Sequence, residues 1–269
     1  MKAIDTSITR HKIVSEAEWV EARKAHLIKE KEFTRLRDEL SRERRELPWT
    51  KVEKLYPFQG PKGQETLADL FDGRSQLVVY HFMFGPGWKE GCPTCSLAAD
   101  NIDGNVAHLA NRDVMLLAVS RAPLSEIEAF KKRMGWRFKW VSSYGSDFNY
   151  DFHVSSTEDE IAKGKAYYNY GELDWDRYPR QERHGISVFY KYKGGEVFHT
   201  YSSYARGPEM LLGAYYFLDI VPKGRDEEAL AHPMQWICHH DRYDGDYLVY
   251  PSGLNSKDPD KCCAPEGDH

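Results

Sequence analysis

The sequence predicts an α/β fold with a mixed central sheet, helices on both of its faces and a long helical arm at the N-terminus. A charged stretch that is nearly free of Gly and Pro, from Ser15 to about Glu46, indicates the arm. Apolar runs at 76–84 and 114–119 are typical of buried strands, and they flank a helical pattern at 92–111. This order is a βαβ unit, the usual way to connect neighbouring parallel strands.

The arm has clear helix signals at both ends. Ser15 followed by Glu18 forms a capping box, and Pro48 ends the helix. Three apolar residues share one face of this helix: Phe33, Leu36 and Leu40. Such a stripe favours a surface helix packed on its own domain, and a dimerisation arm, which would make the protein a homodimer, is the alternative.

The elements after the βαβ unit complete a recognisable order. They are a helix at 124–134, a strand near 138–141, an irregular insertion reaching about 183, two alternating runs at 186–192 and 196–201, and a helix at 208–218. The alternating runs surround Gly194-Gly195, a strong hairpin signal. The order βαβ, helix, hairpin, helix predicts a thioredoxin-like fold. We therefore expect a helical extension at 1–48, a thioredoxin-like domain at 49–225 and a C-terminal tail at 226–269.

Composition excludes several classes of function. The chain has 269 residues, 41% of them hydrophobic, and a formal net charge of −5, so nucleic acid and anionic membranes are not expected partners. The N-terminus lacks the apolar stretch of a signal peptide, and no run of eighteen apolar residues occurs, which predicts a cytoplasmic protein. In that reducing compartment, cysteines indicate redox or metal chemistry rather than a disulfide framework.

The candidate site is the motif Cys92-Pro93-Thr94-Cys95, which follows a predicted buried strand and opens a predicted helix. In this context a C-x-x-C motif indicates redox chemistry, because the two sulfurs share one side of the first turn and the helix N-terminus favours a thiolate. Cys92 is the expected nucleophile, with Lys89 as a nearby positive charge, and Cys95 is the expected resolving thiol. The pair should form a disulfide reversibly.

Other residues are candidates by position. Arg183 and His184 precede the hairpin, in a loop expected to face the cysteines, where Arg183 can stabilise a thiolate and His184 can donate a proton or bind a metal. Trp88 is expected to cover the pair. Cys238-His239-His240 and Cys262-Cys263 lack a specific ligand spacing and are expected to lie in a solvated tail.

Seven runs are specific enough to compare with known families: LPWTKVEKLYPF, LADLFDGRSQLVVYHFMF, CPTCS, AVSRAPL, RMGW, WVSSYGSDFNYDF and HTYSSYARG. In these runs the chain resembles a bacterial family of thioredoxin-like proteins catalogued as a domain of unknown function, grouped with the thioredoxin and alkyl hydroperoxide reductase superfamily. The resemblance covers nearly the whole chain. It implies the fold and the importance of Cys92 and Cys95, and it implies no established reaction.

The chain also resembles peroxiredoxins more loosely. Cys92-Pro93-Thr94 is similar to their peroxidatic motif, and Arg183 falls where their thiolate-stabilising arginine would lie. Two departures stand out: Gly85 and Lys89 occupy the positions of the peroxiredoxin Pro and Thr. The segment before the hairpin also lacks the cis-proline of thioredoxins, which argues against general disulfide reductase activity.

A third resemblance, to copper chaperones of the same superfamily, implies a different use of the motif. Those proteins bind copper through two cysteines and a histidine from the loop before the corresponding strand, which here would be Cys92, Cys95 and His184. The leading hypothesis is a thiol-dependent oxidoreductase that needs no cofactor, as a thiol–disulfide oxidoreductase or a peroxiredoxin-like enzyme. Its substrate, a small-molecule or protein thiol or disulfide, is not identified. A copper-binding protein or copper-dependent enzyme is the alternative, and a module without turnover is a third possibility.

Overall fold

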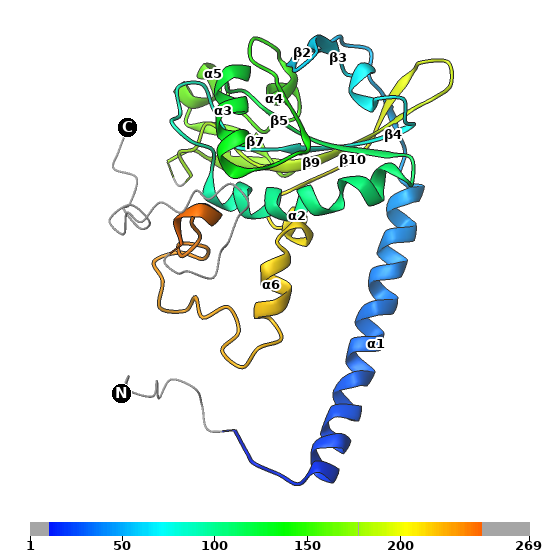
Figure 1. Cartoon of the computed structure of the whole chain (residues 1–269), viewed down its shortest axis with the longest axis vertical. Coiled ribbons are helices and arrows are strands. Elements are labelled where there is room, and N and C mark those ends of the chain that lie inside the picture. The colour runs from blue at the N-terminus through cyan, green and yellow to red at the C-terminus, as the bar shows by residue number, and fades with distance from the viewer. Residues whose placement is uncertain (1–10, 177, 244–269) are drawn as a thin grey trace.

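The structure is a computed structural model that describes residues 11–176 and 178–243. Its centre is an eight-stranded mixed sheet with the order β1-β10-β9-β4-β5-β6-β2-β3 (Figure 1). The strands of this sheet are β1 Thr50–Lys51, β2 Pro57–Gly60, β3 Gly63–Thr66, β4 Gln76–His81, β5 Val114–Ser120, β6 Lys139–Ser142, β9 Gly185–Lys191 and β10 Val197–Tyr204. A separate hairpin consists of β7 Lys165–Tyr168 and β8 Gly171–Asp174.

The predicted α/β architecture with a thioredoxin-like core is confirmed. Strands β4, β5 and β6 are parallel, whereas β9 pairs antiparallel with both β4 and β10. The helices connecting or flanking them are α1 Glu16–Glu46, α2 Pro93–Ala110, α3 Leu124–Met134, α4 Phe148–Asp151, α5 Glu158–Ala162 and α6 Gly213–Leu218, with 3-10 turns at Asp69–Phe71, Gly207–Leu211 and His240–Arg242. The helix expected at 208–218 is therefore divided into a 3-10 turn and α6.

The two faces of the sheet bury different cores, and β4 contributes to both. Because side chains alternate along a strand, Tyr80 packs with Ala98 and Ile102 of α2 in one core. The next residue, His81, faces the other side, where its ring lies 5.6 Å from that of Phe148. The cysteine motif therefore belongs to the α2 face of the sheet.

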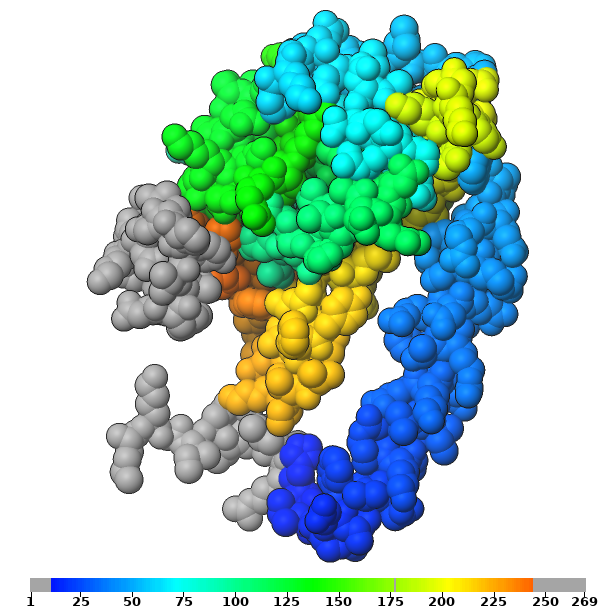
Figure 2. Space-filling model, turned by 45° about the vertical axis from the view of Figure 1, so that its right-hand side comes forward, coloured from blue at the N-terminus to red at the C-terminus, as the bar shows by residue number. Residues whose placement is uncertain are grey.

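The arm α1 does not pack on its own domain. Its capping box at Ser15 and Glu18 forms as expected, but no residue along the helix is buried. Apolar side chains such as Phe33 and Leu36 are exposed, and Figure 2 shows the arm extending away from the body. The expectation of a helix packed on its own domain is wrong because the stripe finds no partner surface within the described residues, and dimerisation stays a prediction.

The expectation of a solvated tail is also wrong for the segment around Cys238-His239-His240. All three residues are buried, with the ring of His239 5.3 Å from that of Phe130 in α3 and His240 hydrogen-bonded to Asp100 of α2. His239 donates a hydrogen bond from Nε2 to the carbonyl oxygen of Gly91, 2.8 Å away, immediately before Cys92. Cys262-Cys263 lies outside the described residues.

An ionic cluster fixes this segment in place. Arg133 of α3 donates from Nε and Nη2 to the two carboxylate oxygens of Asp241, at 2.8 and 2.9 Å, and from Nη1 to Glu90 at 2.6 Å. Arg242 also contacts Glu90. Because bidentate, partly buried pairs of this kind are geometrically specific, the C-terminal segment and α3 together hold the loop that leads into the cysteine motif.

Candidate functional site

The loop before the motif is built by a tight turn. Trp88 donates its backbone N–H to the carbonyl of Gly85, 3.2 Å away, and Gly87 has a φ of 80°. With Pro86 at the second position and a left-handed glycine at the third, the sequence matches a type II turn. The ring of Trp88 folds back over this turn, close to the α-carbon of Gly85.

Cys92 sits at the boundary between this loop and α2. It is the N-cap residue of the helix, and Pro93 occupies the first helical position, where its missing N–H costs no hydrogen bond. The Cys92 N–H donates to the carbonyl of Met83 at 3.0 Å. Gly91 is required before it, since a Cβ there would lie 2.5 Å from the ring of Phe82.

The surroundings of Cys92 favour its thiolate. The largest influence on the pKa of Cys92 is a hydrogen bond from the Cys95 thiol, which lowers it, and burial acts in the opposite direction. The backbone N–H groups of Cys95 and Thr94 and the charge of Arg180 lower the pKa further. The net effect is a pKa of about 7. The free N–H groups at the start of a helix carry partial positive charge, which favours an anion there. Cys92 is thus a half-buried thiol poised near neutral pH.

Cys95 has the opposite character. It is 1% exposed, and burial followed by the adjacent Cys92 sulfur raises its pKa well above the ordinary value. The hydroxyl of Tyr80, from β4, donates a hydrogen bond to its sulfur. Both cysteines are free thiols. One sulfur is therefore acidic and partly accessible, and its neighbour is buried and protonated, which matches an attacking and a resolving thiol.

Arg183 and His184 make no hydrogen bond to either sulfur among the described residues. Arg183 donates from Nη1 to the hydroxyl of Ser156 at 2.6 Å, and its guanidinium lies over the rings of Tyr168 and Trp175. Its Nη2 is buried without a hydrogen-bond partner in the described part of the chain. The catalytic role of Arg183 stays a prediction.

The ring of His184 is hydrogen-bonded to the backbone. Its Nε2 donates to the carbonyl of Ala205 at 2.9 Å, and burial lowers its pKa, so the ring is neutral at pH 7. In residues 11–176 and 178–243, no group of three or more His, Cys, Asp and Glu side chains is arranged to hold a metal ion. Cys92, Cys95 and His184 are therefore not such a group in the described residues, and copper binding stays a prediction.

Three residues near the sulfurs are absent from the sequence-based candidates: Tyr80, Tyr168 and Arg180. Tyr80 had a local signal, because it belongs to the strand that directly precedes the motif and alternation places it on the α2 face. Arg180 comes from the irregular insertion and carries no motif. It is Arg180, and not the predicted Lys89, that supplies the positive charge acting on Cys92.

Comparison with known proteins identifies the family. The family described as "Bacterial protein of unknown function (DUF899)" matches residues 8–243. The chain belongs to this family. No curated protein matches.

Within residues 11–176 and 178–243, no helix is long and apolar enough to cross a membrane.

Solved structures that are similar to the chain include peroxiredoxins of low identity. Peroxiredoxin Q of Xanthomonas campestris is 17% identical, with 62% of this chain and 98% of that chain covered and a TM-score of 0.39. Peroxidoxin BcpB of Mycobacterium tuberculosis is 11% identical over 62% and 94% of the two chains, with a TM-score of 0.36. The mitochondrial 2-Cys peroxiredoxin of Plasmodium falciparum is 14% identical over 64% and 92%, with a TM-score of 0.36.

Proposed function

We propose that the protein is a thiol–disulfide oxidoreductase in which Cys92 attacks and Cys95 resolves. The observation that carries the proposal is the position of Cys92 as the N-cap residue of α2, with the buried Cys95 three residues further along the helix, an arrangement that lowers the pKa of Cys92 to about 7. An attacking thiol works best when its pKa is near the ambient pH. Cys92 meets this condition in the cell.

The reaction balances with the groups present. The Cys92 thiolate attacks one sulfur of a substrate disulfide, forms a mixed disulfide and releases the other substrate sulfur as a thiolate. Cys95 then loses its proton to that departing thiolate or to solvent and attacks Cys92. The Cys92–Cys95 disulfide forms, the second substrate thiol leaves, and the substrate has gained the two electrons that the protein lost.

A disulfide is favoured over a peroxide as the substrate because of the residues around the motif. Gly85 and Lys89 stand where the resembling peroxiredoxins have the Pro and the Thr that activate a peroxide. Arg183, at the position of their thiolate-stabilising arginine, donates to Ser156 instead of a cysteine. The chain thus keeps the thiol pair but lacks the hydroxyl that peroxide chemistry uses. Because it also lacks the cis-proline of thioredoxins, the proposal is for a restricted set of disulfides and not for general disulfide reductase activity.

Trapping of the mixed disulfide tests the proposal. We expect the Cys95→Ser variant, incubated with glutathione disulfide, to gain one glutathione on Cys92, because the serine hydroxyl cannot release it. Intact mass and peptide mapping measure the adduct, and the Cys92→Ser variant is the control that should gain none at this position. A Cys95→Ser protein that stays unmodified at Cys92 over a range of glutathione disulfide concentrations would refute the assignment of the nucleophile.

A further inference from the structure

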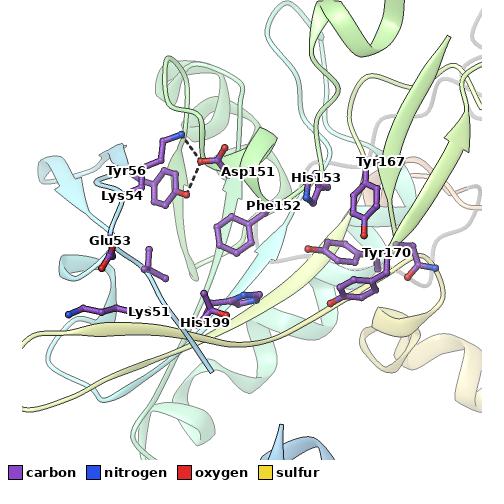
Figure 3. A pocket seen from close by; sticks show the side chains of 14 residues that line it. Lys51, Glu53, Lys54, Tyr56, Asp151, Phe152, His153, Tyr167, Tyr170 and His199 are labelled. Atoms are coloured by element: carbon purple, nitrogen blue, oxygen red, sulfur yellow. Dashed lines mark hydrogen bonds and ion pairs between the residues drawn. The ribbon is translucent and has the colours of Figure 1, made fainter. Parts of the chain in front are cut away.

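A second candidate site lies on the opposite side of β4 from the cysteines. A cavity of about 450 Å³ opens between β1, β10, the end of α4 and the β7–β8 hairpin. Figure 3 shows aromatic rings around it, with Phe152 and His199 in the middle and Tyr167 and Tyr170 at one end. Its size is in the range of small-molecule pockets, and neither Cys92 nor Cys95 lines it.

Part of the cavity wall has strained backbone. Tyr170 and His153 have φ values of 63° and 56°, in the left-handed region that bulky side chains avoid. Asn169 and Tyr170 are the two loop residues between Tyr168 and Gly171, which pair across the hairpin. A two-residue loop with both φ values positive is a type I′ turn, whose preferred sequence is Asn-Gly. A tyrosine stands where glycine would fit without strain.

Core packing does not explain this tyrosine. Tyr170 is 65% exposed, so burial of its ring stabilises the fold little. Its hydroxyl donates to the carbonyl of Ser202 at 2.9 Å, which fixes the ring beside the cavity. At the same end, the ring of His153 packs against Tyr167 at a centroid distance of 4.6 Å. Strain at exposed, fixed rings around one cavity points to a binding role.

Three of the four Lys, Asp and Glu side chains that line the cavity, Lys51, Lys54 and Asp151, are in ion pairs, and Glu53 has none among the described residues. Lys54 is paired with Asp147 at 2.9 Å and with Asp151 at 2.6 Å, and Tyr56 donates to the same Asp151 carboxylate at 2.8 Å. Lys51 is paired with Glu196 at 2.7 Å. An anionic ligand would have to displace the carboxylates paired with Lys51 and Lys54 and would be repelled by Glu53, and a cation would have this single carboxylate to pair with. A neutral ligand leaves these pairs intact.

His199 indicates one polar group of the ligand. Burial lowers its pKa, so the ring is neutral at pH 7. Its Nε2 lies 2.7 Å from the hydroxyl of Ser202 and 3.1 Å from the carbonyl of Tyr201. The carbonyl only accepts, and the Ser202 hydroxyl can accept from Nε2 while it donates to Ser187, so we assign the proton to Nε2. The other ring nitrogen, Nδ1, is then an acceptor, and a hydroxyl is the simplest neutral group that donates to it.

We propose that this cavity binds a neutral, planar aromatic molecule that carries a hydroxyl group. Stacking against Phe152, Tyr167 and Tyr170 would hold its ring, since aromatic pairs gain from ring contact beyond burial alone. The proposal goes beyond the thiol chemistry and does not depend on it, because the two sites use different faces of the sheet.

Binding of 2-naphthol is the direct test. We expect the full chain to bind it saturably, with decahydro-2-naphthol, which has the same hydroxyl but no aromatic face, binding about tenfold more weakly. Isothermal titration calorimetry of both compounds measures the difference. The same affinity in the Cys92→Ser variant separates this site from the cysteine pair, so that failure of one proposal leaves the other standing.

Tyr170→Gly is the decisive variant, because glycine relieves the strain of the turn while the ring is lost. We expect at least tenfold weaker 2-naphthol binding with thermal stability unchanged or raised. Asp72→Gly, which relieves a left-handed residue with φ 48° remote from the cavity, is the matched control and should keep wild-type affinity. Tyr167→Ala provides a second variant. Absence of saturable binding, or wild-type affinity in both Tyr170→Gly and Tyr167→Ala, would overturn the proposal.

Discussion

Replacing Cys92 by serine is expected to slow oxidation of the reduced protein by glutathione disulfide by roughly a thousandfold or more. The loss follows because a serine hydroxyl does not ionise near neutral pH, whereas the Cys92 thiol has a pKa of about 7. Cys95 cannot take over, since it is buried and its own pKa is raised. The rate is measured by rapid acid quench and intact mass.

Ser96→Ala is the matched control for this prediction. The Ser96 hydroxyl donates to the carbonyl of Cys92 at 3.0 Å, in the same helical turn, so its removal perturbs the site but keeps both sulfurs. We expect its rate to stay within a few-fold of wild type. A Cys92→Ser protein that is oxidised as fast as Ser96→Ala would show that another thiol carries the chemistry.

The second large effect concerns pH. Because the fold favours the Cys92 thiolate, alkylation of Cys92 by iodoacetamide should rise through a midpoint near pH 7 and fall off as the thiol is protonated below it. In the Cys95→Ala variant the strongest hydrogen-bond donor is gone, so the midpoint should move up towards the ordinary value of about 8.5. The thiolate fraction at pH 7 would then drop from about half to roughly 3%.

Peptide-resolved mass spectrometry from pH 5 to 10 measures this profile for Cys92 alone. Cys95→Ser is the informative control, because a serine hydroxyl can still donate to the thiolate and should leave the midpoint closer to that of wild type. A wild-type midpoint near 8.5, equal to that of Cys95→Ala, would contradict the electrostatic account of the site.

The central elements of the fold were predictable because their signals are local. The apolar run at 76–84 and the alternating residues around Gly194-Gly195 gave strands close to those observed. The short strands β1, β2 and β3, of two to four residues, were missed because so few residues do not show an alternation of apolar and polar side chains. The expected helix at 208–218 breaks at Leu212, whose backbone has φ −95° and ψ 67°.

The candidate site also contains some residues that the local sequence predicts and others that only the tertiary structure places there. Cys92 and Cys95 are found from sequence because one helical turn sets their relation, and the capping position of Cys92 follows from Pro93. Arg180 and Tyr168 reach the sulfurs through tertiary structure, which no local spacing encodes. The buried position of His239 on Gly91 was missed for the same reason, since its partner is 148 residues away in the chain.

Redox titration of the wild-type thiols tests the central claim most directly. The protein is equilibrated in glutathione buffers of graded potential, quenched by alkylation and mapped by mass spectrometry. The account predicts that Cys92 and Cys95 lose their thiols together, in one two-electron transition, and are linked to each other in the oxidised form. Both sulfurs remaining alkylatable in the most oxidising buffer, or Cys92 retaining glutathione while Cys95 stays free, would contradict it.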